Sequence, residues 1–278
     1  MPKTATPRLR RVPRAAWVGC VAFALLGAVL MLTYVGDRAL LARTARQVEG
    51  GRALSPEGRL TAYVQFANRS LRNPRYQDLP AGPVRLYYRL NPLHPGAGDV
   101  LRWGSDYRGA CGSHSRVVVA MLESAGIPAR HLQILNPRGQ RIHTVVQAWI
   151  GGRWVVADAL YGIVFHRRDG ALATAEELSL DRPNFLAQVR HVPGYDSVLY
   201  DFDQVTSFNW NKIQVLLPAI RKVLVLLVGE QRVAEMTRPA IWAWPQQFYG
   251  VACLVVSAAL LLLALWPGLR PAKPHSAT

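Results

Sequence analysis

Two long apolar runs constrain the fold of this chain more than any other feature. Residues 15–34 and 248–266 contain no charged side chain. Each run has about the 20 residues that a helix needs to cross roughly 30 Å of hydrocarbon. Aromatic residues stand near the ends of the runs, where an interfacial belt would lie: Trp17, Tyr34, Phe248, Tyr249 and Trp266. The sequence therefore predicts two transmembrane helices, at residues 15–35 and 247–267.

The first apolar run has a second interpretation, a cleaved signal peptide. Its length exceeds the roughly 7 to 15 apolar residues of a signal-peptide core. No clear cleavage site with small residues follows Tyr34. A signal anchor that stays in the membrane is therefore favoured.

Basic residues predict the orientation of these two helices. The tail at residues 1–14 carries basic side chains and no acidic one, and two further basic residues, Arg270 and Lys273, follow the second helix. By the positive-inside rule both tails, 1–14 and 268–278, are expected in the cytoplasm, and the part between the helices outside it. Basic residues just after the first helix reduce this asymmetry: Arg38, Arg43, Arg46 and Arg52.

The formal net charge of +16 raises the possibility of nucleic-acid binding. The basic residues are scattered among acidic ones, and no patch interleaves them with aromatic residues on which bases could stack. A soluble surface close to anionic lipid headgroups accounts for the charge. We therefore expect a membrane-embedded protein without a nucleic-acid partner.

The soluble part divides into three segments. Residues 36–100 combine helices with loops: a helix at 37–49, a helix capped by Ser55, and one short strand at 84–90 among prolines. Residues 101–185 form the expected core. Residues 186–246 are a membrane-proximal extension, in which 213–228 is too short and too charged to span the membrane comfortably, so an interfacial helix or a core helix is predicted.

The core segment predicts an α+β fold. A buried helix at residues 113–125 ends at Gly126, and strands follow at 131–135, 141–150 and 153–160. Gly151 and Gly152 between the last two strands predict a tight hairpin. One helix followed by antiparallel strands differs from the alternating order of a parallel sheet.

Cys111 is the only cysteine outside the apolar runs, which contain Cys20 and Cys253. It can form no disulfide within the soluble part, and the count excludes a four-cysteine metal site. At the start of a buried helix its thiolate would be stabilised by the helix dipole, and the neighbouring Gly109 and Gly112 permit close approach of a substrate. The alternative is an inert cysteine that begins a core helix.

The predicted hairpin places His143 and Asp158 together. If Gly151 and Gly152 form the turn, residue 145 faces 158, so His143 and Asp158 are diagonal neighbours on one sheet face, about 7 to 8 Å apart at the backbone. Each alone has a structural explanation, a half-buried strand histidine or an aspartate at a strand end. Together with a cysteine at a helix start they predict a nucleophile, a base and a group that orients the base.

Trp154 and Val156 share this face and are expected in the core rather than in the wall of the site. The remaining histidines show no metal-ligand spacing, so neither a metal nor a cofactor is expected: His94, His114, His131, His166, His191 and His275.

Several motifs in this order resemble the transglutaminase-like core of bacterial proteins. They are Gly109-Ala-Cys-Gly-Ser-His-Ser115, Gly126-Ile-Pro-Ala-Arg130, His143 before Trp149, and Trp154-Val-Val-Ala-Asp158 followed by Tyr161-Gly162. The resemblance covers residues 105 to 180. It implies a papain-like fold in which Cys111 is the nucleophile, His143 the general base and acid, and Asp158 the residue that orients the imidazole. Relatives often carry Glu where Gln147 stands and Pro where Ala159 stands.

The resemblance further implies acyl transfer through a thioester in a protein or peptide substrate. Hydrolysis by an amidase or protease is favoured over transfer to an amine, since water is always available at a surface site. The backbone N–H of Cys111 is one expected oxyanion donor, and Trp103, Ser105 and Tyr107 compete for the second. The alternative is a non-catalytic scaffold in a cell-envelope or polysaccharide assembly. We expect a two-pass protein of the bacterial cytoplasmic membrane, with the catalytic domain facing the periplasm or the exterior.

Overall fold

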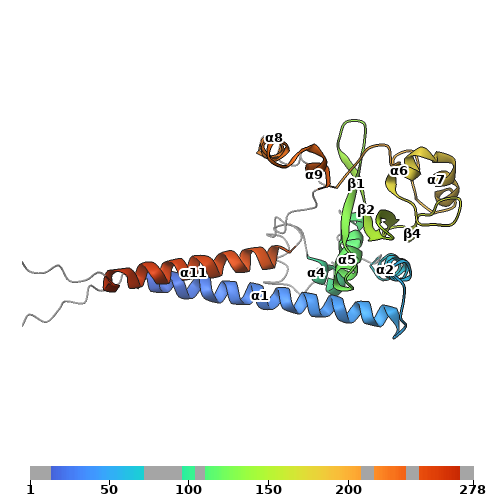
Figure 1. Ribbon diagram of the computed structural model, residues 1–278. Coiled ribbons are helices and arrows are strands. Elements are labelled where there is room, and N and C mark those ends of the chain that lie inside the picture. The colour runs from blue at the N-terminus through green and yellow to red at the C-terminus, as the bar shows by residue number, and fades with distance from the viewer. Residues whose placement is uncertain (1–13, 72–95, 104–109, 208–215, 236–243, 270–278) are drawn as a thin grey trace, which may run out of the picture. The chain divides into compact units, whose positions relative to one another are not determined.

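The computed structural model describes residues 14–71, 96–103, 110–207, 216–235 and 244–269 (Figure 1). The chain divides into two compact units, residues 1–36 with 244–278, and residues 37–243. The described helices and strands are α1 (Arg14–Glu49), α2 (Pro56–Ser70), α4 (Ala97–Trp103), α5 (Ala110–Ser124), β1 (Ala129–Leu135), β2 (Arg141–Ile150), β3 (Arg153–Asp158), β4 (Ile163–Val164), α6 (Ala175–Leu180), α7 (Arg182–Val189), β5 (Val205–Thr206), α8 (Leu216–Val228), α9 (Glu230–Glu235) and α11 (Pro245–Leu269).

The first unit consists of α1 up to residue 36 and the whole of α11. These two helices run side by side (Figure 1). Both helices are long and apolar enough to cross a membrane, as the sequence predicted. Their backbones approach closely, since a Cβ on Gly27 would lie 2.8 Å from Cγ of Leu254 and 3.0 Å from the Gly250 carbonyl oxygen. The Ser257 hydroxyl donates a hydrogen bond to the Cys20 carbonyl at 2.8 Å. Small residues and a polar bond of this kind are typical of helix pairs in membranes.

Helix α1 continues into the second unit without a break, so the helix expected at residues 37–49 is the end of α1 rather than a separate element. The physical reason is that nothing between the two parts stops a helix until Gly50 and Gly51, which both have positive φ. The end of α1 is held by α2, because Glu49 accepts a hydrogen bond from the Tyr63 hydroxyl and pairs with Arg59 Nε at 3.1 Å.

The second unit is built on a five-stranded antiparallel sheet in the order β4-β3-β2-β1-β5. Gly151 and Gly152 join β2 to β3 with φ values of 61° and 78°, the left-handed conformations that a two-residue type I′ turn requires. Ile150 therefore pairs with Arg153, and Val146 with Ala157. The predicted α+β class and the predicted hairpin register are both confirmed.

Both faces of the sheet are covered. On one face Leu132, Ile134, Val145 and Val156 form a buried cluster with residues that follow the sheet in sequence: Phe165, Ala173, Ala175, Leu178, Phe185, Val189 and Phe202. The alternate strand residues, among them Val146 and Ala157, point to the opposite face and are also fully buried. Helix α5 packs on β1 and β2, and α2 packs on α5. Val156 is thus a core residue, as expected.

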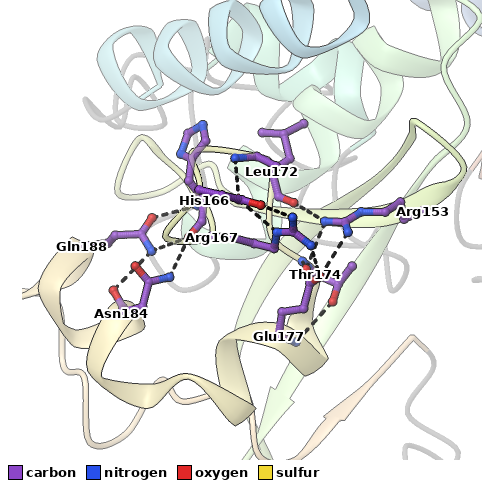
Figure 2. Close-up of polar contacts among 10 residues, drawn as sticks. Arg153, His166, Arg167, Leu172, Thr174, Glu177, Asn184 and Gln188 are labelled. Carbon is purple, nitrogen blue, oxygen red and sulfur yellow. Dashed lines mark hydrogen bonds and ion pairs between the residues drawn. The ribbon is translucent and has the colours of Figure 1, made fainter.

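A polar network fixes the chain that follows β3 (Figure 2). Arg153 binds both carboxylate oxygens of Glu177 at 3.1 Å, and Arg167 reaches the same carboxylate at 3.3 Å. Thr174 and Glu177 form a reciprocal capping box at the start of α6. The network ties α6 to β3.

Three described elements have other boundaries than the sequence predicted, and the first is β1, which begins at Ala129 rather than at residue 131. Helix α5 begins at Ala110, so Cys111 lies inside its first turn. Strand β3 ends at Asp158 rather than at residue 160, because the Asp158 side chain turns the chain by accepting backbone hydrogen bonds. The apolar helix expected at 213–228 is α8, described from Leu216 onward. The strand expected at 84–90 lies outside the described residues.

Candidate functional site

Cys111 is the second residue of α5 and is partly exposed. In the same turn, Nδ1 of the buried His114 side chain donates a hydrogen bond to the Ala110 carbonyl at 2.7 Å. The Ser115 hydroxyl donates to the Thr144 carbonyl of β2 at 2.9 Å. The first contact lies within α5, and the second fixes the start of α5 against β2. The thiol therefore lies where free backbone N–H groups and the helix dipole favour a negative charge.

His143 and Asp158 are in direct contact. Nε2 of His143 lies 2.6 Å from Oδ2 of Asp158, and the side chains are 1% and 0% exposed. A carboxylate can only accept, so Nε2 carries the proton of this bond. The other ring nitrogen, Nδ1, is left for the thiol of Cys111, with which the His143 side chain interacts. The structure thus brings together the three residues that the sequence singled out.

The Asp158 carboxylate is locked in place by the turn after β3. Its Oδ1 accepts the backbone N–H groups of Leu160 at 3.0 Å and Tyr161 at 3.2 Å, so both oxygens are engaged. Helix α2 holds the same turn from outside. Asn68 donates to the Leu160 carbonyl at 2.5 Å, and Gln65 donates to the Gly162 carbonyl at 2.7 Å.

Electrostatics at the site favour a thiolate next to an imidazolium. Burial raises the pKa of the Cys111 thiol, but the hydrogen bond and charge of His143, the Thr144 backbone and the charge of Arg141 outweigh it, so the pKa lies below its ordinary value. Burial lowers the pKa of His143, but the charge and hydrogen bond of Asp158 outweigh it and raise the pKa above its ordinary value. The two opposite pKa shifts favour a thiolate on Cys111 and a proton on His143. This ion pair is the state that a thiol nucleophile requires.

A group of tyrosines covers His143. The ring of Tyr200 stacks on the imidazole at 4.4 Å between centroids and 19° between planes. The ring centroid of Tyr161 lies 5.9 Å from that of the imidazole. The ring centroid of Tyr195 lies 4.8 Å from that of Tyr161 and 5.6 Å from that of Tyr200. Burial, followed by the charges of Tyr200 and Asp158, raises the pKa of Tyr161 to about 12. Aromatic rings therefore shield the imidazole from water.

The loop that carries Tyr200 is held by hydrogen bonds. The Tyr161 hydroxyl donates to the Gly194 carbonyl at 2.7 Å. The Asp196 carbonyl accepts the backbone N–H of Tyr200 at 2.8 Å, and its carboxylate accepts that of Leu199 at 2.9 Å. Sequence reasoning missed Tyr195 and Tyr200, although the aromatic content of residues 190–210 was a signal.

Gln147, for which the resemblance implies Glu in relatives, makes a defined contact. Gln147 accepts a hydrogen bond from Arg130 Nε at 2.8 Å, and the Arg130 guanidinium lies 4.0 Å over the Trp154 ring. Glu at this position would make a charged version of the same contact. The expectation that Trp154 lies in the core is wrong: the side chain is only half-buried, beneath Arg130 and beside Trp149, whose ring centroid is 5.3 Å away.

Two further expectations concern the rest of the site. Of the competing oxyanion donors, Trp103 is the last residue of α4, and Ser105 and Tyr107 lie outside the described residues, so the choice among them stays a prediction. In the described part of the chain no group of three or more histidine, cysteine or acidic residues could hold a metal ion.

Comparison with known protein families gives a match. Residues 82–159 match the family model of the Transglutaminase-like superfamily. The matched segment contains Cys111, His143 and Asp158 and ends before Tyr161, Tyr195 and Tyr200. A search of curated proteins and a search of solved structures gave no match.

Proposed function

Since the chain contains a transglutaminase-like domain, we propose that it is a membrane-anchored thiol enzyme that cleaves or transfers at amide or peptide bonds. The acyl group of the substrate would pass through a thioester on Cys111. The observation that carries this proposal is the 2.6 Å bond between buried His143 and Asp158, next to a thiol of lowered pKa at a helix start.

In the first step the Cys111 thiolate attacks the carbonyl carbon and forms a C–S bond, while the carbonyl oxygen becomes an oxyanion. The C–N bond then breaks, and the proton on His143 Nδ1 passes to the leaving amine. Asp158 keeps its bond to Nε2 throughout, so that the ring stays oriented and its charge is stabilised.

The second step releases the acyl group. A water molecule gives a proton to Nδ1 of His143, its oxygen attacks the thioester carbon, and the C–S bond breaks to return the thiolate. An amine in place of water would give a new amide and make the enzyme a transferase. We favour hydrolysis, because water reaches a surface site without a dedicated binding pocket.

The two apolar helices support a location of this chemistry at the cell envelope. The two apolar helices and the basic tails support a two-pass arrangement with both ends in the cytoplasm. The thiol enzyme would then face the periplasm or the exterior of a bacterial cell and act on protein or peptide there.

Mass spectrometry of Cys111 in its own envelope tests the function. Membranes quenched in acid should contain a fraction of chain with an acyl adduct on Cys111, removable by hydroxylamine. Cys253, in the apolar helix α11, is the control cysteine of the same chain and should carry no adduct.

The competing function, a scaffold that has kept the fold, predicts a different result. Cys111→Ser should abolish the cellular phenotype of an enzyme at normal protein abundance, while Cys253→Ala should not. Full complementation by folded Cys111→Ser protein, together with no adduct on Cys111, would replace the enzyme by the scaffold.

A further inference from the structure

Helix α8 exposes an apolar surface that a soluble domain would not leave in water. Leu226 is 86% exposed, Leu227 74% and Val223 54%, and Ile220 is 39% exposed. The positions 220, 223 and 227 follow helical spacing, so these side chains form one continuous strip along the helix. Single exposed apolar residues are ordinary, but a contiguous strip marks a surface that binds something.

The described length of α8 is shorter than a membrane span, and Arg221 and Lys222 interrupt its apolar residues. Its 13 residues extend about 20 Å at 1.5 Å per residue, well short of the roughly 30 Å hydrocarbon core. Gly229, with φ of 89°, ends the helix, and its N–H bonds the Val225 carbonyl at 2.9 Å. Arg221 pairs with Glu230 of α9, so the turn between α8 and α9 is fixed.

The charges of α8 suit a lipid headgroup layer. Lys222 is exposed and lies one helical turn before Leu226, so that its aliphatic stem can follow the apolar strip while its ammonium reaches phosphate. Across residues 211–244, basic residues outnumber acidic ones: Lys212, Arg221, Lys222, Arg232 and Arg238 against Glu230 and Glu235. This balance favours an anionic surface.

The chain itself leads from α8 to a membrane helix. Residues 229–244 join α8 to α11, and Trp244, the last of them, packs edge-on against Tyr34 of α1 at 5.5 Å. A Trp and Tyr pair at one end of two apolar helices is typical of a membrane–water interface. The bilayer is therefore the apolar partner that the covalent structure keeps within reach of α8.

We propose that α8 lies in the interfacial layer of the membrane that α1 and α11 cross, with Ile220, Val223, Leu226 and Leu227 among the acyl chains and Lys222 at anionic phosphates. This inference rests on the membrane-anchored arrangement of the proposed function, but not on its chemistry. Helix α8 would then be a third membrane contact of the enzyme, after the catalytic domain and before α11 in the sequence.

Nitroxide accessibility in proteoliposomes tests the proposal. The full chain, with Cys20→Ala, Cys111→Ala and Cys253→Ala, receives one cysteine at a time, spin-labelled and reconstituted in vesicles of phosphatidylcholine with phosphatidylserine. Leu226→Cys and Leu227→Cys probe the strip. Val255→Cys on α11 is the lipid control, and Leu180→Cys on α6, 80% exposed, is the water control.

Collision rates with oxygen and with a water-soluble nickel chelate then identify the surroundings of each label. Labels at 226 and 227 should favour oxygen, as at 255, whereas the label at 180 should favour nickel. Nickel-favouring labels at 226 and 227, with 255 in lipid, would overturn this inference alone. Low collision with both reagents would indicate a protein partner or a second copy and would also overturn it. A water-like label at 255 would remove the membrane anchor as well.

Discussion

Tyr200 stacks on His143 with its ring 4.4 Å from the imidazole and inclined by only 19°. The Tyr200 ring thereby covers one face of the imidazole, while Asp158 accepts a hydrogen bond from Nε2 at the edge of the imidazole ring. Tyr200 lies more than 40 residues beyond the segment that matches the family model, which ends at residue 159. The candidate catalytic histidine is thus covered by a loop that follows the matched segment in the sequence.

Removing this aromatic ring should weaken the ion pair of the site. A cation over an aromatic face gains about 0.5 to 2 kcal/mol, so Tyr200→Leu should slow alkylation of Cys111 at neutral pH by roughly two- to thirtyfold. Tyr200→Phe keeps the ring and should keep the rate. Leu199→Ala, on the exposed neighbour, is the matched control. An unchanged rate in Tyr200→Leu would show that the stack does not support the imidazolium.

The pH profile of Cys111 alkylation reports the opposite pKa shifts of the site. Because a thiolate forms only above the thiol pKa, a lowered pKa moves the midpoint of the profile below the ordinary value of about 8.5. His143→Ala removes the groups that lower the pKa most, and leaves burial, which raises it. The midpoint should therefore rise in this variant, and alkylation at neutral pH should slow.

Asp158→Asn should give a midpoint between those of the wild type and His143→Ala. The amide still contacts Nε2, but it no longer supplies the charge that raises the pKa of His143. His191→Ala, on an exposed histidine, should leave the profile unchanged. Equal midpoints in wild type and His143→Ala would remove His143 from the role of base.

The turn after Asp158 should depend on α2. Asn68→Leu and Gln65→Leu each remove a hydrogen bond to a carbonyl of this turn, which costs about 0.5 to 1.5 kcal/mol of folding stability per bond. The double variant should melt at a lower temperature in detergent and alkylate more slowly at Cys111, since Asp158 loses its support. Thr61→Ala, on the exposed side of α2, is the control, because its hydroxyl bonds only within the helix. Wild-type melting and alkylation in the double variant would contradict this role.

Protease added outside the cytoplasmic membrane tests the topology of the chain directly. If the basic tails stay inside, residues 37–246 should be digested while epitope tags at both chain ends survive. Digestion of this segment only after lysis would place the catalytic domain in the cytoplasm, and loss of either tag in sealed cells would reverse that end of the chain.

The sequence by itself determined the parts of this protein that rest on local periodicity. The two apolar helices follow from runs without charge, and the hairpin register follows from Gly151 and Gly152, because positive φ at both positions allows one tight turn. A strand places alternate residues on one face, so this register alone brings His143 and Asp158 together. The start of α5 near Cys111 was likewise readable from flanking glycines.

Only the tertiary structure decided what surrounds these residues. Tyr200 reaches His143 across 57 positions of sequence, and Asn68 reaches the turn after Asp158 across 92, through loops whose paths no periodic pattern encodes. Loop conformation depends on contacts such as Tyr161 to Gly194, which exist only after the sheet and the helices have packed. The identity of the candidate site residues is therefore local information, whereas their shielding and support are properties of the folded chain.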